Sequence, residues 1–292
     1  MIPKIIHYCW FGRNPLPELA QKCIASWKQY CPDYQIIEWN EDNFDIDSAP
    51  QYVRQAHAAK KWAFITDYVR LYALTELGGI YMDTDVEVIK SLDPFLRHRA
   101  FSGFEDETQV PTGIMACEKG FPLFLELLHH YDPAVFPSSE SQMQAETNVV
   151  IITNTLSEKG LCRNNTYQEI EGFALYPKDY FCPKSYVDGK IYLTDNTATI
   201  HHFSASWKGK KEAKIITDRW AYFEKLRASK FLRLRYKSLS DEAYEEKIHQ
   251  IWGRKQRRIE RIHLLLHSPF KLLQKVIGAD RFQAIKRKIR GR

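Results

Sequence analysis

Apolar and polar positions follow two different periods along the first 90 residues. Helical spacing of apolar side chains begins near Pro15 and Pro17 and continues to about Tyr30, and it recurs over 49–60 and 62–77. Short apolar runs of strand length lie between these segments, at 2–8, 34–39, 80–82 and 86–89. Strands that alternate with helices predict an α/β fold, in which a mostly parallel sheet carries helices on both faces.

The rest of the chain has a weaker pattern. We predict short strands near 100–104, 112–117, 173–176 and 198–203, and helices near 121–131 and 145–159. The sequence contains no internal repeat. After Trp207 it changes to a helical stretch rich in Lys and Arg, punctuated by Pro269 and Gly278. We therefore predict two parts, a body at 1–207 and a basic helical tail at 208–292.

Composition sets broad limits on the class of protein. The chain has 292 residues, of which 44% are hydrophobic, so it can bury a large core. No apolar run reaches the length of roughly 18 residues that spans a bilayer, and the strand-like start predicts no signal peptide. Six cysteines without a CxxC pair favour reduced thiols in the cytosol over a disulfide framework or a zinc site.

Charge is distributed unevenly along the chain. Residues 208–292 contain 25 Lys and Arg against 9 Asp and Glu, whereas residues 1–207 contain 17 against 27. The tail is thus basic (+16) and the body acidic (−10), which suggests different tasks for the two parts.

Two carboxylates, Asp83 and Asp85, follow the apolar strand predicted at 80–82. Residues at i and i+2 of an extended strand share a face, and ligands bind at the carboxyl ends of parallel strands. Buried carboxylates need a positive partner, and a divalent metal prefers such oxygen ligands. We predict a metal and nucleotide site here; the alternative is a turn with capping carboxylates.

Three further groups of residues are candidates, each with a purely structural alternative. Asp67 and Arg70 share a helix face and form either a simple intrahelical ion pair or a grip on sugar hydroxyls. His7 and Trp10 end the first strand, where an aromatic ring either stacks on a nucleotide base or belongs to the core. His201, or its neighbour His202, is either a core residue or a third metal ligand.

The tail segments 255–267 and 270–290 space Ile, Leu, Val and Phe at helical intervals with Lys and Arg between them. This pattern indicates a basic amphipathic helix suited to an anionic membrane surface. Nucleic-acid binding and a helix packed on the body with a solvated basic face are the alternatives.

Three separated segments together resemble glycosyltransferase family 32, the sugar transferases with a DXD motif. They are IPKIIHYCWFG at the start, ITDYVRLYALTELGGIYMDTD in the middle and IHHFSASW near 200–207. A more distant similarity links them to the catalytic domains of the large clostridial glucosylating toxins. The resemblance covers about 1–207, excludes the tail, and implies a GT-A fold for the body.

The resemblance also implies a role for each matching residue. Trp10 would stack on the uracil of the donor, Asp67 and Arg70 would grip its sugar, and Tyr81 would lie near its diphosphate. Asp83 would contact ribose or metal, while Asp85 and His201 would hold the metal, usually Mn²⁺, otherwise Mg²⁺; His202 is the second choice. The toxins have a carboxylate where this chain has histidine. The remaining implied contacts are Ser206 and Trp207 over the diphosphate and Asn40 near the nucleoside.

The predicted function is a metal-dependent, retaining transfer of a sugar from a nucleotide sugar, foremost a UDP-sugar, to a glycan acceptor. Front-face attack would need no covalent nucleophile, although Glu105 and Asp106 follow a predicted strand and face the sugar in one interpretation. The basic tail suggests a lipid-linked saccharide of bacterial surface polysaccharide synthesis, with the enzyme in the cytoplasm on the inner face of the plasma membrane. We expect no nucleic-acid partner.

Two other functions are alternatives. One is a non-catalytic nucleotide- or glycan-binding module. The other is a haloacid-dehalogenase-like phosphatase, a class that has Thr or Val at the position that Glu87 occupies here.

Overall fold

The computed structural model describes residues 1–137, 147–185, 188–204, 220–241 and 243–254. The chain divides into two compact units, 1–214 and 215–292, which are described separately. The boundary predicted between 207 and 208 and the amphipathic segments 255–267 and 270–290 lie outside the described residues. Within the described residues, no helix combines the length and the apolar composition needed to cross a membrane.

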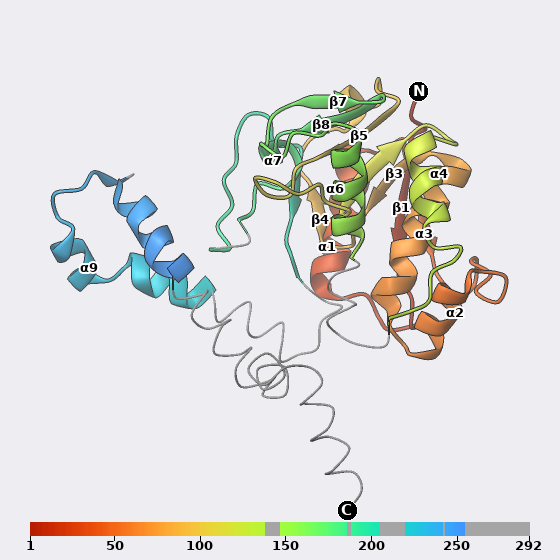
Figure 1. Ribbon diagram of the computed structural model, residues 1–292, viewed down its shortest axis with the longest axis horizontal. Coiled ribbons are helices and arrows are strands. Elements are labelled where there is room, and N and C mark those ends of the chain that lie inside the picture. The colour runs from red at the N-terminus through yellow and green to blue at the C-terminus, as the bar shows by residue number, and fades with distance from the viewer. Residues whose placement is uncertain (138–146, 186–187, 205–219, 242, 255–292) are drawn as a thin grey trace, which may run out of the picture. The chain divides into compact units, whose positions relative to one another are not determined.

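Strands and helices alternate through the first unit (Figure 1). In chain order the elements are β1 (Ile5–Cys9), α1 (Glu18–Tyr30), β2 (Gln35–Trp39), α2 (Gln51–Ala58), α3 (Trp62–Leu77), β3 (Gly79–Met82), β4 (Val86–Val88), the 3-10 turn η1 (Asp93–Phe95), β5 (Ala100–Gly103), β6 (Ile114–Cys117), α4 (Pro122–His129), α6 (Asn148–Glu158), β7 (Gln168–Ile170), β8 (Phe173–Tyr176), α7 (Lys178–Phe181) and β9 (Thr199–His201). The periodicity predicts nearly all of these elements to within a few residues. It misses β7, a polar edge strand, and the single turns η1 and α7.

The central sheet has seven strands in the order β2-β1-β3-β6-β5-β8-β7. Strands β2, β1, β3, β5 and β8 run in one direction, whereas β6 and β7 run against them. The predicted α/β class with a mostly parallel sheet is therefore confirmed. A separate two-stranded sheet pairs β4 with β9 in antiparallel fashion.

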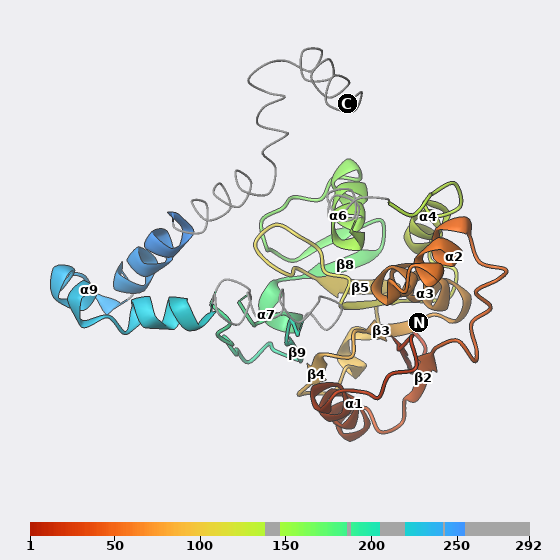
Figure 2. The same ribbon diagram turned by 90° about the horizontal axis from the view of Figure 1, so that it is seen from below.

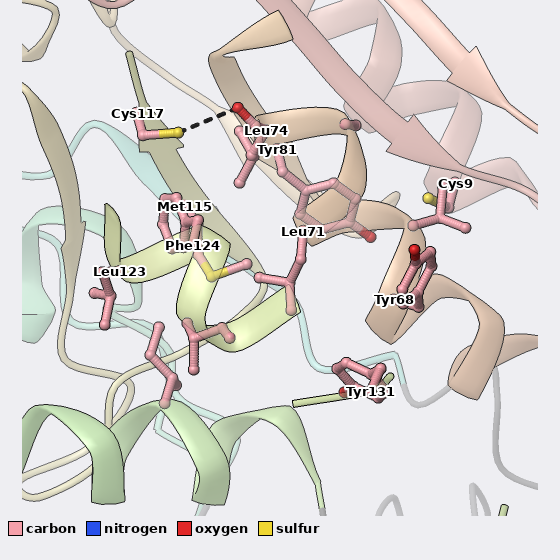
Figure 3. Close-up of a cluster of buried hydrophobic side chains, with 14 of the residues drawn as sticks. Cys9, Tyr68, Leu71, Leu74, Tyr81, Met115, Cys117, Leu123, Phe124 and Tyr131 are labelled. Atoms are coloured by element: carbon pink, nitrogen blue, oxygen red, sulfur yellow. Dashed lines mark hydrogen bonds between the residues drawn. The ribbon is translucent and has the colours of Figure 1, made fainter. Parts of the chain in front are cut away.

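Helices cover both faces of the central sheet (Figure 2). Alternate residues of a strand point to opposite faces, and β3 divides its side chains accordingly: Tyr81 joins the core under α3, α4 and α6, while Ile80 and Met82 join the core under α1. The first of these cores is drawn in Figure 3, where Cys117 Sγ lies 3.4 Å from the carbonyl oxygen of Leu74.

The break between α3 and β3 depends on two glycines. Gly78 and Gly79 have φ angles of +69° and +104°, which side chains rarely tolerate. A Cβ on Gly78 would also stand 2.7 Å from the backbone nitrogen of Lys119. These glycines let the chain leave α3 and enter the middle of the sheet directly, so that β3 ends at Met82 and Asp83 follows it.

Candidate metal and nucleotide-sugar site

Asp83, Asp85 and His201 form a three-residue cluster beyond the carboxyl end of β3. One ligand atom from each residue lies within 4.8 Å of the other two. The pairing of β4 with β9 sets Val86 opposite His201, which brings residues more than 110 positions apart to one place. Two carboxylate oxygens and an imidazole nitrogen are a donor set that fits Mn²⁺ or Mg²⁺.

The two aspartates meet through a turn and not through an extended strand. Asp83 donates its backbone N–H to Gly113 and accepts one from Val86, so residues 83–86 form a tight turn between β3 and β4. The two aspartates do lie close together, but the expected cause, an i, i+2 spacing along an extended strand, is wrong. The turn, held against the loop before β6, aligns the two carboxylates.

Gly113 makes room for the cluster. A Cβ at this position would stand 2.8 Å from His201 Cε1 and 3.3 Å from Asp83 Oδ2. A side chain here would therefore displace the imidazole, so the absence of one is part of the site.

Asp85 is held as a charged acceptor although it is nearly buried. Its Oδ1 lies 3.3 Å from His201 Nε2, and its Oδ2 accepts the backbone N–H of Ser204 at 2.7 Å. Burial would raise the pKa of Asp85, but His201 and the Ser204 N–H outweigh it and hold that pKa well below its usual range. Burial would likewise lower the pKa of His201, but Asp85 raises it well above the usual value.

His201 and His202 point in different directions. His202 Nε2 lies 2.8 Å from Glu87 Oε2, and its backbone N–H bonds the carbonyl oxygen of Asp85. His201 faces Asp83 and Asp85. His201 is thus the histidine placed to act as a ligand, whereas His202 supports the turn. That His201 binds the metal, as the resemblance implies, stays a prediction.

Arg70 connects α3 to the acidic cluster. Its guanidinium lies 3.2 Å from Asp67 Oδ1 and 3.4 Å from Asp83 Oδ1, and it donates to the carbonyl oxygen of Thr112 at 2.6 Å. It also lies over the ring of Tyr81, 4.7 Å from the centroid. The intrahelical ion pair exists, with Arg70 buried and Asp67 half-buried. Both residues line the cleft, so the two interpretations of Asp67 and Arg70 do not exclude each other.

Tyr81 and Arg70 leave Asp83 with one free oxygen. Tyr81 is 1% exposed and donates its hydroxyl to Asp83 Oδ1 at 2.7 Å. Since Arg70 lies near the same oxygen, Oδ2 is the atom that faces Gly113 and the metal cluster.

Asp67 has an environment unlike that of Asp85. Burial raises the pKa of Asp67 to about 6, and Asp83 adds to the rise while Arg70 opposes it. Asp67 therefore keeps its proton to a higher pH than Asp85 does.

A cleft of about 640 Å³ joins these residues. Its floor carries the acids and Arg70, and an aromatic wall includes Trp10, Phe11, Trp62 and Phe64. Trp10 is half-buried and donates its indole N–H to the carbonyl oxygen of Asn14 at 2.6 Å. Its position in the wall agrees with the predicted role in base stacking, which stays a prediction.

Two predicted contacts are corrected by the structure. His7 is completely buried, with Nε2 bonded to the Gly78 carbonyl oxygen and Nδ1 to the indole of Trp39, and burial lowers its pKa to about 4. It lies two residues before the strand end and so faces the sheet–helix core. Asn40 follows the edge strand β2, bonds Glu38, Asp42 and Asn43, and does not line the cleft.

Other residues of the site lie outside the main motifs. Glu105, a candidate because it follows a predicted strand, comes after β5 and lines the cleft, and burial raises its pKa; that it faces the sugar stays a prediction. Asn148 and Ser204 have no obvious signal in the sequence. Asn148, at the start of α6, donates to the backbone oxygen of Asp67 at 2.8 Å. Ser204 was absent from the prediction, and the predicted Ser206 and Trp207 lie outside the described residues.

Comparison with known proteins agrees with this geometry. Residues 17–102 match the family model described as "Glycosyltransferase sugar-binding region containing DXD motif". The predicted resemblance to DXD-motif sugar transferases is thus confirmed, and the matched segment contains Asp67, Arg70, Tyr81, Asp83 and Asp85. Trp10, Glu105 and His201 lie outside it.

Curated relatives include two fungal proteins. Inositol phosphoceramide mannosyltransferase 3 of Schizosaccharomyces pombe is 30% identical over 132 residues, which is 44% of this chain and 37% of that protein. Mannosyl phosphorylinositol ceramide synthase CSH1 of Saccharomyces cerevisiae is 31% identical over 141 residues, 45% of this chain and 36% of that protein. The chain therefore spans a little over a third of the length of these relatives.

Solved structures with a partial likeness include the PaToxG glycosyltransferase, with a TM-score of 0.43 and 19% identity over 55% of this chain and 70% of that one. The galactosyltransferase LgtC has a TM-score of 0.36 and 17% identity over 75% of this chain and 95% of that one.

Proposed function

We propose that this protein is a metal-dependent, retaining glycosyltransferase. It moves a sugar from a nucleotide sugar, foremost a UDP-sugar, to a glycan acceptor. The observation that carries the proposal is the cluster of Asp83, Asp85 and His201 at the floor of a cleft whose central residues belong to a matched sugar-binding region.

Asp83 Oδ2, Asp85 and His201 would hold the cation, with Mn²⁺ or Mg²⁺ as the ion. When bound, such an ion supplies positive charge for the departing diphosphate. The protein's own residues prepare the site: Ser204 and the β4–β9 pairing fix Asp85 and His201, while Tyr81 and Arg70 orient Asp83.

Donor recognition falls to the rest of the cleft. Asp67 and Arg70 would bind hydroxyls of the sugar, and Tyr81 stands beside Asp83, where a diphosphate would approach. Trp10 would stack on the base. Ser206 and Trp207, two and three residues beyond Ser204, would cover the diphosphate.

Retention of configuration by front-face attack is the mechanism that we favour. The acids that line the cleft are Asp67, Asp83, Asp85 and Glu105, within the described residues. The first three already contact Arg70, Tyr81 or His201, and we propose no nucleophilic role for Glu105, whose pKa is raised by burial. A Glu105→Gln variant should still give product of the donor's anomeric configuration, and NMR of the product measures this.

For the acceptor we propose a lipid-linked saccharide, such as one used in bacterial surface polysaccharide synthesis. The names of the fungal relatives, which refer to inositol phosphoceramide, support a lipid-bound acceptor. The basic tail at 208–292 would hold the enzyme peripherally on the cytoplasmic face of the plasma membrane.

A donor screen tests the proposal. Thermal-shift measurements with Mn²⁺ and a panel of UDP-sugars identify base and sugar. The panel includes GDP-mannose because the Schizosaccharomyces pombe relative is named a mannosyltransferase. Product formation with the stabilising donor supports a transferase. Tight binding of UDP with neither transfer nor donor hydrolysis would favour the non-catalytic binding module instead.

A further inference from the structure

The second unit contains its own small helical core. Phe223, Tyr244, Ile248 and Trp252 are buried together, and Leu232 and Tyr236 pack against them. These last two belong to the segment around α9 (Lys230–Arg235), whose first turn is capped by the side chain of Ser229, which accepts the N–H of Leu232. One side of α9 is therefore fixed on a folded unit.

The other side of α9 presents two large apolar side chains to solvent. Phe231 is 68% exposed and Leu234 is 71% exposed. They stand three residues apart, so they lie on one face of the helix. Among the described residues, only Met1 is a more exposed large hydrophobic side chain than these two.

The surroundings of this apolar pair are strongly basic. Residues 225–237 contain six Lys and Arg and no Asp or Glu. Lys230 and Arg235 flank the pair directly and are exposed. Arg233 is held by Asp241 at 2.7 Å and lies 4.1 Å from the centroid of the Tyr244 ring, which fixes the helix to its own unit.

We propose that α9 docks on an anionic bilayer surface, with Phe231 and Leu234 inserted at the boundary of headgroups and acyl chains. Lys230 and Arg235 then face the lipid phosphates. This inference rests on the proposed function, because a lipid-linked acceptor requires the enzyme at a membrane, and it names the element that makes the contact.

Charge and shape together favour a bilayer over nucleic acid. Nucleic-acid backbones are bound by Lys and Arg and need no projecting aliphatic side chain. An anionic bilayer binds both kinds of side chain, since its negative surface potential attracts Lys and Arg and its interface accommodates apolar side chains. The apolar pair is thus the feature that distinguishes the two partners.

The experiment compares full-length variants by co-sedimentation with vesicles of phosphatidylcholine alone or with a third of phosphatidylglycerol. Phe231→Ser with Leu234→Ser leaves the charge unchanged and should weaken binding to the anionic vesicles at least ten-fold. Lys230→Gln with Arg235→Gln should reduce the preference for anionic over neutral vesicles several-fold. Val135→Ser, at a side chain of the first unit that is 60% exposed, serves as the matched control and should bind like the unchanged protein.

Equal vesicle binding by the Phe231/Leu234 double variant and the unchanged protein would overturn the proposal, and so would an equal loss in the Val135 control. All variants should keep their melting temperature and their affinity for UDP with Mn²⁺, since the altered side chains are exposed. The proposed transferase function is judged by product formation alone: it fails if no donor is turned over, whatever the vesicle result, whereas a vesicle failure with intact transfer removes only the docking role of α9.

Discussion

Asp67 on α3 is half-buried and Asp85 beyond β3 is buried, and each lies beside a cation, yet their pKa values move in opposite directions. Asp85 accepts a backbone N–H from Ser204 and lies beside His201, and its pKa falls. Asp67 has one guanidinium contact at 3.2 Å and a second carboxylate, Asp83, nearby, and its pKa rises to about 6. The difference lies in what faces each carboxylate: at Asp85 the charge of His201 and the hydrogen bonds from His201 and Ser204 outweigh burial, whereas at Asp67 the charge of Arg70 does not.

The difference matches the tasks that we propose for the two residues. A metal ligand must be deprotonated, and Asp85 is held in that form even without the ion. A residue that binds neutral sugar hydroxyls has no such need. The surroundings of Asp85, the proposed metal ligand, therefore lower its pKa, whereas those of Asp67, the proposed sugar-binding residue, raise it.

The largest expected effect comes from removing the charge of Asp85. Asp85→Asn takes one anionic ligand from the cation, and transfer should fall about 1,000-fold or more, as when a group that stabilises transition-state charge is lost. Activity assays with Mn²⁺ titration measure this, and melting curves verify the fold. Full activity in excess EDTA would show that transfer does not depend on a metal ion.

Arg70 lies beside Asp67 and Asp83, so its loss should disturb both of these carboxylates. Arg70→Met leaves Asp67 and Asp83 without their buried cation, and the free energy of unfolding should fall by about 3 kcal/mol. Urea denaturation measures it. Arg13→Met, which breaks an exposed pair with Asp42, is the matched control and should leave stability unchanged; an equal loss in both variants would speak against a special role for Arg70.

Gly113→Ala tests the metal cluster through sterics alone. The added Cβ would meet His201 Cε1 at 2.8 Å and displace the ring, so Mn²⁺ affinity should fall about ten-fold or more. Gly103→Ala, where a Cβ would meet Phe181 at 3.0 Å, is the control. It should cost stability without loss of Mn²⁺ affinity, as isothermal titration calorimetry can determine.

The contrast between the acids also predicts a dependence of stability on pH. The pKa of Asp67 is higher in the fold than the ordinary 3.8, so the folded state binds more protons between about pH 4 and 6 and loses stability as pH rises through that window. Asp85 acts oppositely: its contribution is present above pH 3.8 and is lost as pH falls. In EDTA, Asp67→Asn should remove a loss of roughly 2 kcal/mol between pH 4 and 7. An unchanged pH profile of unfolding in this variant would contradict the assigned environment.

The smallest effect concerns the wall of the cleft, away from both acids. Trp10→Phe keeps an aromatic face of smaller area, and the KM for the donor should rise only a few-fold, with kcat little changed. Asn40→Ala should leave both constants unaltered, because Asn40 does not line the cleft. A larger effect at Asn40 than at Trp10 would reverse the correction made to the predicted nucleoside contacts.

The sequence predicts the parts of the site that depend on local pattern. Short stretches of sequence are enough to predict the strand before Asp83, the glycine break at Gly78 and the helix that carries Asp67 and Arg70. The resemblance adds His201 over His202, and the structure shows the imidazole of His201 facing the aspartates.

What the sequence does not reveal depends on pairings between distant segments. Gly113 and Ser204 meet Asp83 and Asp85 through the antiparallel β3–β6 and β4–β9 contacts, for which no local signal exists. His7 and Trp10 are three residues apart, and only the exact end of β1 decides that one is core and the other lines the cleft.

The most direct test of the central claim is anomalous diffraction from crystals soaked with Mn²⁺ and UDP. We expect a manganese peak within bonding distance of Asp83, Asp85 and His201, with the diphosphate as a further ligand. A manganese peak elsewhere, or bound UDP with no metal at these three residues, would contradict it.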